Sequence, residues 1–136
     1  MKGAGSTGKT SFANMITTGD MNKYAGFPIR TFKTTHGTIE VLLIEHDRIE
    51  FDPERYDAIL HFHKVTDFQP YESHVPLVHV FCFKDYLSDS DFDQVHEKKG
   101  HYSHPIADIS NLSKYNHEKP ILFLLRQLLG DDLNYV

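Results

Sequence analysis

The first residues of the chain form a pattern that binds phosphate. Gly3 to Thr10 read Gly-Ala-Gly-Ser-Thr-Gly-Lys-Thr and fit GxxxxGK[ST] at every specified position. Glycines let the backbone curl so that its N–H groups point at phosphate oxygens. Lys9 would place an ammonium on the outer phosphates, and Thr10 would give its hydroxyl to a magnesium ion. The sequence therefore predicts a site for Mg²⁺ and phosphate, with a flexible glycine-rich terminus as the alternative interpretation.

A helix must follow such a loop, and a strand should come before it. Ser11 to Ile16 can open a helix whose N-terminal dipole favours the same anion, so we predict a helix from Lys9 to about Thr18 that stops at Gly19. Only Met1 and Lys2 precede the loop, too few for the buried strand. We therefore expect the first strand to be missing.

Strands and helices alternate along the rest of the sequence. Strands are predicted at residues 28–35, 38–44, 57–63, 75–83 and 106–109, the first two joined as a hairpin by His36-Gly37. The nearly continuous apolar run at 75–83 is typical of a strand buried on both faces of a parallel sheet. Residues 88–99 are charged and compatible with a helix, and 117–129 predict an amphipathic helix that Gly130 stops. Such alternation favours one α/β domain over residues 1–136.

Composition narrows the classes of partner. The net charge is −5, so the chain has no global basic field to attract nucleic acid, and its longest apolar run is far too short to span a bilayer. We expect a monomer that binds neither nucleic acid nor a membrane. The single cysteine, Cys82, cannot form an internal disulfide, which fits a reducing compartment. It lies in an apolar run, where a thiol is usually buried and inert.

Ten histidines raise the question of metal binding. His61 and His63 alternate on a predicted strand, and both could face one side; such a pair can bind zinc through its imidazole nitrogens. No cysteine or carboxylate at ordered spacing accompanies the pair. Ordinary polar residues on a sheet face are the preferred interpretation, and the other eight histidines are scattered along the chain.

With these segments in view, the chain resembles the Ran family of small GTPases, which belongs to the Ras-like P-loop superfamily. The closest stretch is residues 108–120, Asp-Ile-Ser-Asn-Leu-Ser-Lys-Tyr-Asn-His-Glu-Lys-Pro, which is similar to the end of the last Ran strand and the start of its final helix. Residues 128–136, 95–99, 75–78 and 19–24 continue the resemblance with gaps. It implies a three-layer P-loop NTPase domain with a mostly parallel sheet, without the first strand and, between residues 66 and 73, without most of the third helix.

The resemblance implies GTP or GDP with Mg²⁺ as cofactors. The implied nucleotide-binding residues are Gly3, Ala4, Gly5, Ser6, Thr7, Gly8, Lys9, Thr10, Ser11, Asp85 and Ser110, with Thr10 as the metal ligand. Asp85 corresponds to the aspartate of the guanine-reading NKxD motif, whose asparagine is absent. Ser110 is the one residue kept from the SAK motif.

The switch elements depart from the family pattern. The DxxG motif aligns with Glu45-His46-Asp47-Arg48, so an arginine stands where a glycine senses the γ-phosphate. Ile49 stands where a glutamine would orient the attacking water. No threonine clearly matches the one in switch I. No catalytic residue is identified, and we expect GTP hydrolysis to be weak or absent.

The implied role is nucleocytoplasmic transport, with nuclear transport receptors or Ran regulators as partners and the nucleus and cytoplasm as location. Lys98-Lys99 could contact acidic partners, although a solvated helix end explains them equally well. Two alternatives stay open. One is a degenerate, non-hydrolysing Ran-like protein that acts through its surface, and the other is a non-functional remnant.

Overall fold

In the described residues the strands follow one another between α-helices near the two ends of the chain, and together they make a mixed α/β fold. The computed structural model describes residues 1–3, 7–24, 26, 28–46, 52–63, 74–82, 104–111 and 113–136. In chain order the elements are α1 (Lys9–Thr18), β1 (Ile29–Thr34), β2 (Gly37–Leu42), the 3-10 turn η1 (Pro53–Arg55), β3 (Ile59–His63), β4 (Leu77–Phe81), β5 (Ile106–Asp108) and α3 (Lys119–Leu129). The segments at 66–73 and 88–99, on which we made predictions, lie outside the described residues.

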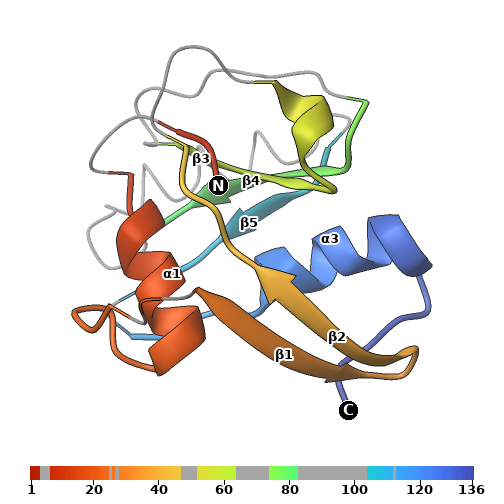
Figure 1. Cartoon of the computed structure of the whole chain (residues 1–136), viewed down its shortest axis with the longest axis horizontal. Coiled ribbons are helices and arrows are strands. Elements are labelled where there is room, and N and C mark those ends of the chain that lie inside the picture. Colours follow the sequence, from red (N-terminus) through yellow and green to blue (C-terminus); the bar gives the residue numbers. More distant parts are fainter. Residues whose placement is uncertain are drawn as a thin grey trace.

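β3, β4 and β5 form a parallel sheet in that order (Figure 1). Every residue of the three strands is buried, so both faces of the sheet are covered. This confirms the prediction from the apolar run at 75–83, because parallel sheets bury both faces.

The predicted hairpin is also present. β1 and β2 pair antiparallel, with Thr34 opposite Gly37 at the turn. Gly37 has a φ of 107°, which suits glycine. The end of the chain ties this hairpin down, since the N–H of Thr35 donates to Asn134 O at 2.9 Å and the N–H of Val136 to Lys33 O at 3.0 Å.

One face of the three-stranded sheet packs against both helices. In the view of Figure 1, α3 lies between this sheet and the hairpin. The buried cluster draws on α1, the hairpin, the sheet and α3, and its members include Phe12, Ile16, Phe32, Leu60, Phe62, Val78, Val80, Ile109, Ile121, Leu125 and Leu133. α3 begins at Lys119, two residues later than predicted, with Pro120 in its first turn, and ends where the N–H of Gly130 donates to Arg126 O at 3.0 Å.

No strand precedes α1 in the described part of the chain, yet its place in the sheet is partly filled. Lys2 makes isolated parallel bridges to His46 on one side and to His61 on the other. Its N–H donates to Leu60 O at 2.8 Å, and its carbonyl accepts from the N–H of Phe62 at 2.8 Å. A single residue therefore links the chain after the hairpin to β3, immediately before the phosphate loop.

Candidate functional site: the phosphate loop

Two glycines of the loop occupy positions that a side chain would not fit. Gly3 has a φ of 147° and Gly8 a φ of 94°. A Cβ added at Gly3 would lie 2.5 Å from Phe62 O, and one at Gly8 would lie 2.8 Å from the Cβ of Cys82. The first and last glycines of the pattern are thus required by backbone conformation and by close packing on the ends of β3 and β4.

Lys9 begins α1 and turns back across the loop. It is buried, and its Nζ donates to Gly3 O at 2.7 Å and to Thr7 Oγ1 at 3.5 Å. The ammonium is therefore held on the inner side of the loop. α1 has Gly8 at its N-cap with no side-chain cap and no acidic residue in its first turn, so its positive end can favour an anion there.

Thr10 faces a carboxylate from the segment that follows β2. Its hydroxyl donates to Glu45 Oε1, three residues after the end of β2. A hydroxyl and a carboxylate side by side are the hard oxygen ligands that Mg²⁺ prefers. Both residues line a cavity of about 330 Å³ together with Asn14, Thr17 and Tyr24.

The residues after β4 and β5 pack against the loop. Asn111 Nδ2 donates to Gly8 O at 3.2 Å, and Cys82 lies next to Gly8, where it leaves no room for a Cβ. Burial raises the pKa of the Cys82 thiol, as the prediction of an inert thiol requires. Ser110 is fully buried and its Oγ accepts from the N–H of Ser113 at 3.0 Å, which makes it a turn-forming residue in this structure.

The structure brings together most of the predicted phosphate residues that it describes. One loop and the start of α1 contain Gly3, Thr7, Gly8, Lys9 and Thr10. Ser11 is half-buried in the first turn of α1. Four predicted residues lie outside the described part of the chain, namely Ala4, Gly5, Ser6 and Asp85.

Sequence reasoning missed two contributors. Glu45 stands at the first position of the aligned DxxG motif, but we gave it no role in the site. Asn111 follows Ser110 in the stretch aligned with the SAK motif, where the pattern assigns a role to Ser110 alone. A carboxylate three residues after a strand was a usable signal for Glu45, whereas nothing in the local sequence links Asn111 to Gly8.

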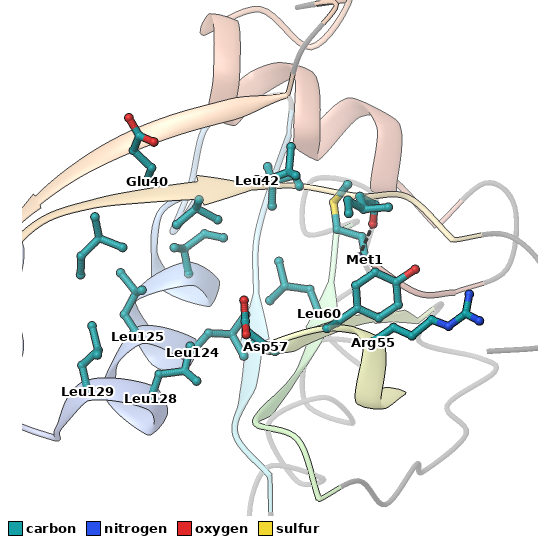
Figure 2. A pocket seen from close by; sticks show the side chains of 17 residues that line it. Met1, Glu40, Leu42, Arg55, Asp57, Leu60, Leu124, Leu125, Leu128 and Leu129 are labelled. Carbon is teal, nitrogen blue, oxygen red and sulfur yellow. Dashed lines mark hydrogen bonds between the residues drawn. The ribbon is translucent and has the colours of Figure 1, made fainter. Parts of the chain in front are cut away.

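A separate apolar groove lies between β2, β3 and α3. It has a volume of about 520 Å³ and is lined mainly by aliphatic side chains, with Met1 at one end (Figure 2). The N-terminal amine of Met1 donates to Ile44 O at 2.6 Å, which closes that end. In the described residues β2 and β3 do not pair with each other, and the groove separates them. Its apolar lining is unsuited to phosphate.

Of three comparisons with known proteins, only the one with solved structures found matches. No family model matches it, and no curated protein matches it. Among solved structures, the crystal structure of a mutation variant of SsGBP is similar, with 19% sequence identity and a TM-score of 0.56. The match covers 93% of this chain and 54% of that chain, so this chain spans about half of that structure's length. At this identity the likeness concerns the fold alone. None of the described helices has the length and apolar character needed to cross a bilayer.

Proposed function

We propose that the chain is a Ran-like protein that binds Mg²⁺ and a guanine nucleotide through the loop at Gly3 to Thr10. The observation that carries this proposal is the joint placement of Lys9, Thr10 and Glu45. An ammonium on the inner side of the loop can stabilise phosphate charge, and the hydroxyl of Thr10 beside the Glu45 carboxylate offers oxygen ligands for the metal. The role in nucleocytoplasmic transport, with transport receptors as partners, rests on the resemblance to the Ran family.

Hydrolysis should be slow in this proposal. Charge stabilisation by Lys9 and magnesium remains, but Arg48 and Ile49 replace the γ-phosphate sensor and the water-orienting glutamine of the family. Bound GTP would therefore be hydrolysed only slowly. Its surface contacts would depend weakly on the third phosphate.

Binding can be tested with fluorescent GTP and ATP analogues titrated in the presence of Mg²⁺. Lys9→Ala removes the loop ammonium and should weaken GTP binding by at least about tenfold, since a hydrogen bond to a charged group contributes about 1.5–3 kcal/mol. Lys23→Ala is the matched control, because Lys23 is exposed after α1 and should leave binding unchanged. Glu45→Gln should weaken binding only when Mg²⁺ is present.

Three results would count against the proposal. Equal affinity for the GTP and ATP analogues would refute the guanine assignment. Equal binding by wild type and Lys9→Ala would refute the loop as the phosphate site. A folded protein that binds neither nucleotide would favour the non-hydrolysing alternative that acts through its surface.

A further inference from the structure

The parallel register of β3 and β4 gathers three histidines on one face of the sheet. His61 and His63 are two residues apart, so they share a face of β3, and His61 pairs directly with His79 of β4. Leu60 and Phe62, which alternate with the two histidines along β3, belong to the core under α1 and α3. The histidines therefore lie on the opposite face of the sheet, away from those two helices.

The three rings are close together and almost fully buried. Their exposed fractions are 8%, 3% and 1% for His61, His63 and His79. One ring nitrogen from each lies within 4.8 Å of the others, and His63 Nε2 is 2.9 Å from His79 Nδ1. The centroids of the His61 and His63 rings are 4.0 Å apart. In the described residues, this is the cluster in which histidine, cysteine or acidic side chains could hold a metal ion.

The protonation state of the cluster suits a metal. Burial lowers the pKa of His61 to about 3 and that of His79 to about 4, so both are neutral at pH 7. Neutral imidazole is the form that coordinates zinc. The short contact between His63 and His79 also fits a hydrogen bond between two neutral rings.

The spacing requires little adjustment. Zinc–nitrogen bonds of about 2.0–2.1 Å in a tetrahedral site place nitrogens about 3.4 Å apart. The 2.9 Å pair is already closer than this, and any wider pair must approach by at most roughly 1.4 Å, which ring rotation can supply. His104 lies beside the cluster, with its ring centroid 6.2 Å from that of His79. Asp108 is buried and follows Ala107 of the core on β5, so its side chain belongs to the same face as the histidines.

We propose that His61, His63 and His79 bind one Zn²⁺ ion on the face of the sheet opposite α1 and α3. Three nitrogen ligands favour zinc over Mg²⁺ or Ca²⁺, which prefer oxygen. Three protein ligands leave a fourth position for water or a further side chain. The proposed zinc site does not depend on nucleotide binding, because Lys9 and Thr10 belong to α1, which packs on the opposite face of the sheet.

The test uses the full chain after treatment with a chelator. Zn²⁺ should bind with one equivalent and raise the melting temperature, and Co²⁺ added to the metal-free chain should give the visible absorption of a tetrahedral nitrogen site. His79→Leu keeps the strand apolar and should weaken zinc binding at least about a hundredfold, since even partners of a ligand contribute 10–100-fold. His74→Gln, at an exposed histidine before β4, is the matched control and should bind as wild type does.

Each outcome decides the question. Failure of wild type to bind one equivalent, or a Co²⁺ spectrum of octahedral type, overturns the proposal without any variant. Equal affinity of His79→Leu and wild type shows that surface histidines hold the metal and also overturns it. If His79→Leu does not fold, His61→Gln replaces it with the same expectation.

Discussion

The buried histidines should make the fold sensitive to mild acid. Burial lowers the pKa of three histidines from an ordinary 6.5, to about 3 for His61 and to about 4 for His79 and His117. The unfolded chain therefore binds more protons than the folded one between about pH 4 and 6.5. The contribution of the three neutral histidines to stability should be fully present above pH 6.5 and should be lost as the pH drops through that window.

The magnitude follows mainly from the unfolded state. At pH 5, protonation of one histidine with a pKa of 6.5 favours the unfolded chain by about 2 kcal/mol, while the folded rings gain almost nothing. Because some solvent screening remains, we take half of this, about 1 kcal/mol per ring and about 3 kcal/mol for the three. Domains typically have only about 5–15 kcal/mol of stability, so this loss is large.

Urea unfolding at pH 7, 6 and 5 measures the effect, with EDTA present so that no metal competes with protons. The midpoint should fall with an unchanged m-value. His79→Leu should remove about a third of the pH dependence, and His74→Gln should leave it as it is. Equal stability at pH 7 and pH 5 would refute the reasoning, as would a His79→Leu protein with the full pH dependence.

Three further predictions concern the loop and the ends of the fold. Gly8→Ala should cost about 2–4 kcal/mol, from left-handed backbone strain and the contact with Cys82, and a neutral effect in urea unfolding would contradict the packing. Burial lowers the pKa of the Met1 amine from 8.0 to about 6, so stability should rise by about 1–2 kcal/mol between pH 6 and 8; an Nα-acetylated chain should show no rise. Glu118→Gln breaks a half-exposed ion pair with Arg30 and should cost under about 1 kcal/mol by thermal unfolding, whereas a larger loss would reveal a buried role.

Elements with a strong local pattern were predictable from the sequence. α1 begins at Lys9 and ends before Gly19, whose φ of 80° is the left-handed stop expected of glycine. The hairpin follows from two strand-like runs around His36-Gly37, and β4 from its apolar run. These features depend on residues close in sequence, which is why pattern and propensity suffice.

The bridges of Lys2 were not predictable. One residue has no periodicity, and its pairing depends on backbone groups of Leu60 and Phe62, about sixty positions away. The sequence predicted only that the first strand is missing. In the structure, Lys2 bridges both His46 and His61 just before the loop. The groove between β2, β3 and α3 lies beyond these bridges.

The site residues also differ in how far the sequence alone could predict them. The phosphate loop is a contiguous motif, so Lys9 and Thr10 could be assigned directly. Glu45 and Asn111 reach the loop only through tertiary packing. His61 and His63 stood out by spacing, whereas the part of His79 depends on a parallel register that places it opposite His61.

The loop can keep its shape without a full strand before it, because its support is local. Lys2 is bonded to β3 on one side, and Met1 O accepts from the N–H of His46 on the other at 2.9 Å. Gly3 then lies against Phe62, and Gly8 against Cys82. These contacts are made by backbone groups and by Phe62 and Cys82, not by the side chains that line the groove, and they fix where the loop enters and leaves. Nucleotide affinity and global stability should therefore vary separately among variants of this chain.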